Sequence, residues 1–207
     1  MKSNNEAGYA EGAELEGLRL IAKNRMSEHR YIHTVSVAER AAKLAKIYGE
    51  DEYKAYKAGL LHDICKDTSK EEQLALIMRY LPDFETCAPE WYRSQALWHS
   101  LAAALYAEHE LRESDPEILN AIRYHTSARA GMSRLEELVY LADLTSAERD
   151  YPDVGVVRRL SETDVSAAML YSLQYIVCDL VKKGALLTPE TAEAYNQYAQ
   201  ASPAAGK

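Results

Sequence analysis

Apolar side chains recur every three to four residues along nearly the whole chain, the spacing of a helix that buries one face. Leu15, Leu18 and Ile21 are the first example. We find no stretch with the apolar–polar alternation of a half-buried strand. Helices patterned in this way bury their apolar faces by packing against one another. The sequence therefore predicts an all-α protein built as a bundle of helices.

Helix-capping residues divide this pattern into separate helices. Ser27 can cap a helix that stops at Gly49, and Asp115 followed by Pro116 opens another. Capping boxes stand at Ser69 with Glu72 and at Ser133 with Glu136. The expected helices cover residues 15–26, 27–49, 51–64, 72–80, 91–111, 117–126, 135–148 and 164–183. Residues 83–90 and 150–163 are expected to be loops.

The order of these helices suggests one domain. We find no internal repeat and no linker, and 207 residues suit one sizeable core. We expect a flexible leader over residues 1–12, a single domain over 13–197 and a disordered tail over 198–207.

Composition excludes several classes of protein. A net charge of −8 argues against nonspecific nucleic-acid binding, which needs a basic surface. No apolar run is long enough for a membrane span, and the N-terminus lacks the apolar core of a signal peptide, so a cytoplasmic location is expected. Cys65, Cys87 and Cys178 are too dispersed to suggest a disulfide framework or a cysteine zinc site.

Six polar residues lie in or at the end of apolar helical sequence. The run AGLLHDICKD ends with His62 and Asp63 side by side, although aspartate is rarely buried without a partner. Residues on five different helices can meet only in the middle of a bundle, where bundles build metal sites. The six are His33, His62, Asp63, His99, His125 and Asp143.

These residue types suit a pair of metal ions. Neutral imidazole binds first-row transition metals, and a carboxylate can bridge two of them. Asp63, adjacent to His62, is well placed to bridge. Two ions about 3.5–4 Å apart can hold both sides of a phosphoryl group. Lys66 follows the same helix end and could meet a phosphate oxygen.

At these residues the sequence resembles a known family. The ordered set H…HD…H…H…D is similar to that of HD-domain metal-dependent phosphohydrolases. More narrowly, RYIHTVSVAERAAKLAKIYG, AGLLHDICKD, AIRYHT and YLADLTSAERDYP resemble the bacterial YqeK-type symmetrical bis(5'-nucleosyl)-tetraphosphatases, which bind iron. The resemblance runs from Arg30 to Ala192.

The resemblance implies a reaction and a role for each residue. A hydroxide bridging two transition-metal ions would attack a central phosphorus of diadenosine tetraphosphate and release two ADP. Iron is the implied metal, and manganese, zinc or cobalt would also suit the ligands. His33, His62, Asp63 and Asp143 would hold one ion, and Asp63, His99 and His125 the second. Lys66, Arg149 and Thr126 would lie near the polyphosphate, with Asp63, Lys66 and Arg149 as the catalytic set.

Tyr124 and three departures from the family pattern bear on the substrate. The chain has 15 tyrosines against one phenylalanine, and Tyr124, beside His125, is a candidate to stack on a base. Ser100 stands where the family usually has glycine, and Ser127–Ala128 replaces a usual Thr–Gly pair. Because these residues neighbour the expected ligands, substrate preference is more open than metal binding.

Other interpretations remain open at this point. The enzyme could act on a mononucleotide or another phosphoester, or the chain could be a nucleotide-binding or interaction module with a structural metal. Lys66 could be a solvated residue, and Arg149 could pair with Glu148 or Asp150 at the surface. His29 precedes His33 by one turn but lies in a polar segment, so we do not expect it to be a ligand. For Cys65 a packing or exposed role is expected rather than metal ligation, and the N-terminal helix could form a homodimer.

Overall fold

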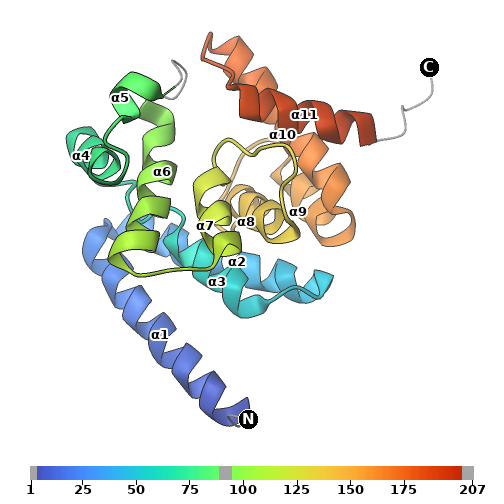
Figure 1. The fold of residues 1–207 in the computed structure, drawn as a ribbon. Helices are drawn as coiled ribbons and strands as arrows, with labels where there is room; N and C mark the ends of the chain where they lie inside the picture. The colour runs from blue at the N-terminus through green and yellow to red at the C-terminus, as the bar shows by residue number, and fades with distance from the viewer. Residues whose placement is uncertain (1–3, 89–94, 202–207) are drawn as a thin grey trace, which may run out of the picture.

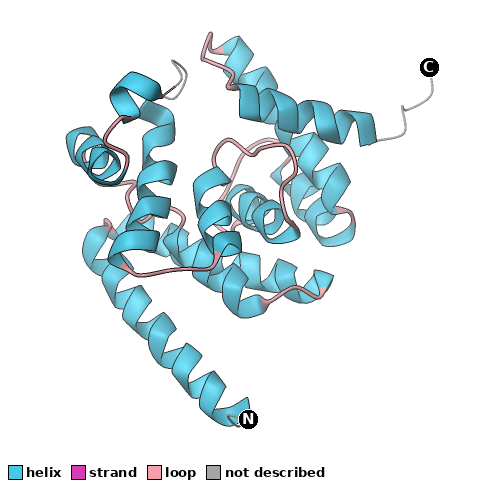
Figure 2. Cartoon of the chain, in the orientation of Figure 1, coloured by secondary structure: helices cyan, strands magenta, loops and turns pink. Residues whose placement is uncertain are grey.

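The computed structural model describes residues 4–88 and 95–201, with side chains from residue 11 onward. Within these ranges the chain consists of helices and the turns between them, with no strand (Figures 1 and 2). None of the helices in these ranges has the length and apolar character needed to cross a membrane. The prediction of an all-α helical bundle is confirmed.

The described helices follow one another along the chain with short connections. They are α1 (Asn4–Arg25), α2 (Glu28–Tyr48), α3 (Glu52–Leu61), α4 (Lys70–Tyr80), α5 (Phe84–Cys87), the 3₁₀ turn η2 (Gln95–Leu97), α6 (Trp98–Leu105), the π-helical turn η3 (Tyr106–Glu110), α7 (Pro116–Tyr124), α8 (Arg134–Thr145), α9 (Val154–Thr163), α10 (Val165–Lys182) and α11 (Pro189–Ala201).

The predicted caps are confirmed. The Ser27 hydroxyl accepts from the N–H of Arg30, and both capping boxes close as expected. Gly49 ends α2 with φ 72°, in the left-handed region that glycine adopts without strain. Local sequence chemistry therefore sets the starts of α2, α4 and α8.

Several predicted boundaries are wrong. The first helix begins at Asn4 rather than Leu15, and residues 198–201 belong to α11. The helix expected over 51–64 ends at Leu61. Residues 91–94 of another lie outside the described ranges, and the rest divides into η2, α6 and η3.

The expected loops also contain helices. The segment 83–90 includes α5, and the segment 150–163 includes α9. The expected loop overlooked the helical spacing of Val154, Val157 and Leu160 in α9; Val157 is buried, and Glu162 pairs with Arg40 of α2. The helix α11 was not predicted because its sequence PETAEAYNQYAQA is mostly polar.

The core forms where α2, α3, α7 and α8 pack together, with α6 against α7 and α10 against α8, α9 and α11. Leu44, Leu60 and Leu138 are fully buried there. Gly59 lets α3 approach α2 closely, because a Cβ at this position would lie 2.8 Å from Cα of Ala38. In contrast, α1 extends away from the body (Figure 1).

Candidate metal centre

The end of α3 places His62 and Asp63 inside the bundle. The helix stops at Leu61, and a turn follows in which the N–H of Lys66 donates to the carbonyl of Asp63 at 2.9 Å. His62 is fully buried and Asp63 is 3% exposed. The helix end thus directs two consecutive polar side chains toward the interior, which explains the polar pair in an apolar run.

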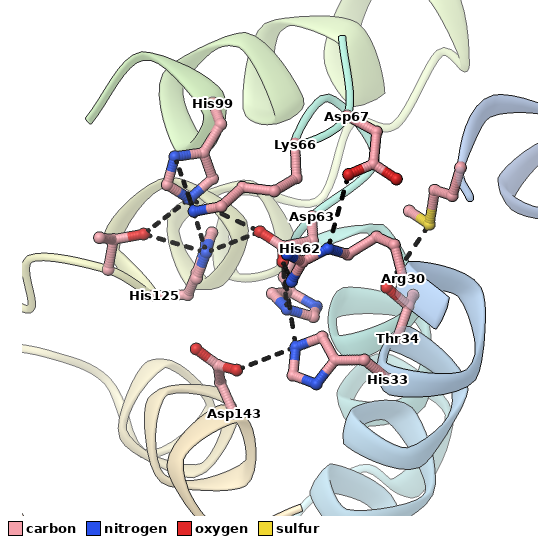
Figure 3. Close-up of polar contacts among 12 residues, drawn as sticks. Arg30, His33, Thr34, His62, Asp63, Lys66, Asp67, His99, His125 and Asp143 are labelled. Carbon is pink, nitrogen blue, oxygen red and sulfur yellow. Dashed lines mark hydrogen bonds and ion pairs between the residues drawn. The ribbon is translucent and has the colours of Figure 1, made fainter. Parts of the chain in front are cut away.

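The structure brings all six expected ligand candidates together around Asp63 (Figure 3). Its Oδ1 lies 3.5 Å from Nε2 of His99 and 3.5 Å from Nε2 of His125. Its Oδ2 lies 3.5 Å from Nε2 of His62 and 3.9 Å from Nε2 of His33. Asp143 joins from α8, with Oδ1 3.1 Å from Nε2 of His33. The Asp63 carboxylate therefore stands between two groups of imidazoles.

The donor set fits divalent metal ions. His33, His62 and Asp63 form one group that could hold an ion, and Asp63, His99 and His125 form another. Within the described chain, Nε2 of His33, Nε2 of His62 and Oδ1 of Asp63 are buried without a hydrogen-bond partner. Buried polar atoms are nearly always bonded. Nε2 of His33 faces the Asp143 carboxylate at 3.1 Å, whereas Nε2 of His62 comes no nearer to Asp63 than 3.5 Å and has room for a further partner. Imidazole and carboxylate donors are those that first-row transition metals accept.

The outer ring nitrogens fix how the imidazoles face the centre. Nδ1 of His62 donates to the Gly59 carbonyl at 2.6 Å, and Nδ1 of His125 donates to the Ile122 carbonyl at 2.7 Å. Nδ1 of His33 donates to the carboxylate of Glu148. Each bond occupies the outer nitrogen, which leaves Nε2 directed inward with its lone pair available.

Burial and neighbouring charges give several of these residues the protonation states that bind metals. Burial lowers the pKa of His62 to about 4. Burial, with the neighbouring His125 and Lys66, lowers the pKa of His99 to about 3. For Asp63, burial raises the pKa, but the facing imidazoles, led by His62, outweigh it and hold the pKa well below its usual range. At neutral pH these groups are neutral imidazoles and an ionised carboxylate, the forms that bind metals.

Two predicted substrate residues lie against the His99 side of the cluster. Nζ of Lys66 is 3.1 Å from Nε2 of His99, so the ammonium contacts the cluster. The residue as a whole is exposed. The Thr126 hydroxyl is 3.0 Å from Nε2 of both His99 and His125.

The other two predicted substrate residues occupy different surroundings. Arg149 donates through Nε to the Asp143 carbonyl at 2.8 Å and through Nη2 to the Asp143 carboxylate, rather than pairing with Glu148 or Asp150. The ring of Tyr124 faces Arg129, whose guanidinium carbon lies 4.8 Å from its centroid.

Sequence reasoning missed two residues of this region. Arg30 donates through Nη1 to Oδ2 of Asp63 at 2.8 Å, and Glu148 holds His33. Arg30 precedes His33 by three residues on the same helix, so its spacing was a usable signal. Glu148 follows α8 in a polar segment, and no pattern singles it out. His29 is exposed on the wall of a cavity of about 310 Å³ beside Arg30 and Arg149.

The departures from the family pattern have distinct structural settings. Ala128 is buried with φ 55°, in the left-handed region that favours glycine, which accounts for the glycine usual there. The Ser127 carbonyl accepts from the Thr191 hydroxyl at 2.8 Å, so α11 packs on the segment after His125. The Ser100 hydroxyl donates to the Leu97 carbonyl at 3.0 Å.

Comparison with known proteins matches the part of the chain that carries the His/Asp cluster. The HD domain family model matches residues 30–148, more than half of the chain. The symmetrical bis(5'-nucleosyl)-tetraphosphatase of Bacillus subtilis (strain 168) is 40% identical over 179 residues, which cover 84% of this chain and 91% of that protein. The protein of the same name from Halalkalibacterium halodurans is 37% identical, over 86% of this chain and 92% of its own.

A solved structure shares the fold. A Clostridium acetobutylicum protein, described as a predicted HD superfamily hydrolase involved in NAD metabolism, superposes with a TM-score of 0.85 at 30% identity. The match covers 91% of this chain and 98% of that protein. The ligand geometry, the family match and the relatives agree: this chain is a hydrolase of the HD-domain family and belongs to the symmetrical bis(5'-nucleosyl)-tetraphosphatases within it.

Proposed function

We propose that this chain cleaves diadenosine tetraphosphate symmetrically into two molecules of ADP. The observation that carries the proposal is the Asp63 carboxylate, which is buried between two groups of histidines that direct Nε2 toward it, each group able to hold a metal ion. The identity of the substrate is inferred from the names of the relatives.

The proposed ligands divide into two groups that share Asp63. His33, His62, Asp63 and Asp143 would hold one ion, and Asp63, His99 and His125 would hold the second. Two divalent ions bound there would polarise the phosphoryl group and supply a nucleophile at neutral pH. The family resemblance favours iron, while the mixed imidazole and carboxylate donors also suit manganese, zinc or cobalt.

The cationic residues would bind the polyphosphate on two sides of the cluster. Lys66 reaches the His99 side, and Arg149 reaches Asp143, which contacts His33. Because the two halves of the substrate are identical, one cation for each half would centre the chain of four phosphates and favour cleavage in the middle. Both cations would also neutralise charge on the departing ADP.

Two further residues would position the substrate. The Thr126 hydroxyl, within hydrogen-bond distance of His99 and His125, would hold a phosphate oxygen near the Lys66 ammonium. Tyr124, beside Arg129, would stack on a base at the edge of the site.

Product analysis tests this function. The metal-loaded protein incubated with diadenosine tetraphosphate should yield ADP as its nucleotide product. Faster turnover of a mononucleotide or p-nitrophenyl phosphate would instead favour a general phosphoesterase. No turnover of any of these with iron, manganese, zinc or cobalt would favour a binding module with a structural metal.

Two further predictions concern the whole molecule. We propose a homodimer formed through α1, which extends from the body and carries Leu20 with 61% of its surface exposed. Light scattering coupled to size-exclusion chromatography measures the mass in solution and decides between one copy and two. A cytoplasmic location also stays a prediction, and cell fractionation tests it.

A further inference from the structure

Arg158 of α9 binds the main chain where α8 ends. Its Nε donates to the Thr145 carbonyl at 3.1 Å. Its Nη2 lies 2.6 Å from the carbonyl of Ser146, 3.3 Å from that of Ala147 and 2.9 Å from that of Arg149. One guanidinium thus satisfies carbonyls that a helix end leaves without partners. Its charge also complements the negative end of the helix dipole.

The segment held by Arg158 carries two groups that contact the expected metal ligands. Glu148 accepts from Nδ1 of His33, and the Ser146 hydroxyl supports that carboxylate at 2.6 Å. Arg149 binds both the carbonyl and the carboxylate of Asp143. The outer partners of His33 and Asp143 are therefore adjacent residues of one short loop.

This loop is also anchored from the side of α2. The N–H of Ala147 donates to the Ser36 hydroxyl at 3.1 Å. Arg40 of α2 binds the Arg158 carbonyl at 3.3 Å and the Ser161 hydroxyl at 2.8 Å, which fixes α9 against the helix that carries His33. Arg158 therefore belongs to a helix, α9, that is hydrogen-bonded to α2, the helix that carries His33.

We propose that Arg158 is a positioning residue that sets the geometry of the His33 half of the metal centre and of Arg149, by fixing residues 145–149. The proposal rests on the metal site proposed above. The shape of the side chain matters, because a guanidinium presents several N–H groups in a rigid fork. A lysine ammonium at the same place can approach only part of this set of carbonyls.

Neighbouring arginines provide a matched test. Arg158→Met removes the fork, and Arg159→Met removes an exposed arginine from the next position of the same helix. The affinity of each purified protein for Mn²⁺ is measured by titration calorimetry, and kcat and KM are measured with diadenosine tetraphosphate. Loss of partners around metal ligands typically costs about 10–100-fold in metal affinity. We expect Arg158→Met to bind Mn²⁺ about tenfold less tightly than the wild type and to have a higher KM. Arg159→Met should match the wild type in both.

A purely structural role gives a different result. It would lower the thermal midpoint and the amount of active enzyme, but leave KM and the Mn²⁺ affinity of the folded molecules unchanged. Equal Mn²⁺ affinity in Arg158→Met and Arg159→Met overturns the proposal. If Arg158→Met does not fold, Arg158→Lys decides: weaker Mn²⁺ binding supports the proposal, and wild-type binding overturns it.

The Mn²⁺ titration separates this proposal from the proposed function, because it needs no substrate. A wild type that leaves diadenosine tetraphosphate intact would overturn the hydrolase assignment. Weaker Mn²⁺ binding by Arg158→Met in that case would still support the positioning role.

Discussion

Nδ1 of His33 donates a hydrogen bond to the Glu148 carboxylate, which joins the second turn of α2 to the loop after α8. Burial raises the pKa of Glu148, but hydrogen bonds from Ser146 and His33 outweigh it and lower the pKa to about 2. Glu148 is therefore ionised at neutral pH and accepts from Nδ1 of His33, which orients the ring with Nε2 toward the cluster.

Removal of this carboxylate should weaken metal binding without removing a ligand. We expect Glu148→Ala to lower the affinity for Mn²⁺ by about 10–100-fold, because His33 loses the bond that orients its ring. Titration calorimetry measures the effect, with Glu39→Ala as a control for an exposed glutamate of α2. Identical affinity in the two variants would contradict this role.

Asp63 should matter more than any other single group, because it faces both histidine groups. Asp63→Asn replaces the shared negative charge with a neutral amide, so we expect at least about a hundredfold loss of kcat and loss of bound metal. Metal content by mass spectrometry and steady-state rates test this. Asp83→Asn, at an exposed aspartate whose side chain makes no capping bond, is the control. An Asp63→Asn protein that keeps its metal and its rate would contradict the bridging role.

Gly59 should be intolerant of a side chain for reasons of space. Gly59→Ala places a Cβ 2.8 Å from Cα of Ala38, and we expect a loss of about 1–3 kcal/mol in the free energy of unfolding. Gly17→Ala in α1 meets nothing within 4 Å and should gain up to about 1 kcal/mol from helix propensity. Urea unfolding measures both. Equal effects of the two substitutions would contradict the close approach of α2 and α3.

Much of the site was predictable because its residues interrupt a strong pattern. His33, His62 and Asp143 lie in or at the end of apolar helical sequence, where a polar residue needs a reason, and the structure brings them together. Glu148 and Arg158 could not be found in this way, because they lie in polar segments. Their roles arise from contacts between α2, α8 and α9 that no local spacing encodes.

In the fold, too, some elements were predictable from local sequence and others were not. Strong caps such as Ser69 and Ser133 fixed the starts of their helices in advance. The helix α11 has a mostly polar sequence, and tertiary contacts such as the buried Tyr198 and its bond to Glu137 hold it in place. Local propensity is a weak guide where packing supplies the stability.

Asp115 gives the protein a measurable response to acid. Its carboxylate caps α7, and a hydrogen bond from Lys54 at 2.8 Å contributes most to lowering its pKa. Because the pKa is lower in the folded state, the stabilisation is present above the ordinary pKa and is lost as the pH falls through the folded value. Asp115→Asn keeps a capping oxygen and removes the charge.

The wild type should therefore be more stable than Asp115→Asn at pH 7, and the difference should shrink toward pH 3. Urea unfolding of both proteins at the two pH values measures it. A difference that is the same at pH 3 and pH 7 would show that the charge of Asp115 makes no contribution.

Metal-dependent symmetrical cleavage is best tested by chromatography of the products from diadenosine tetraphosphate, with and without a chelator. We expect ADP as the nucleotide product, loss of activity on chelation and recovery when a divalent metal is restored. ATP with AMP would show that the bond cleaved is not the central one, and chelator-insensitive formation of ADP would show that the His/Asp cluster does not work through a metal.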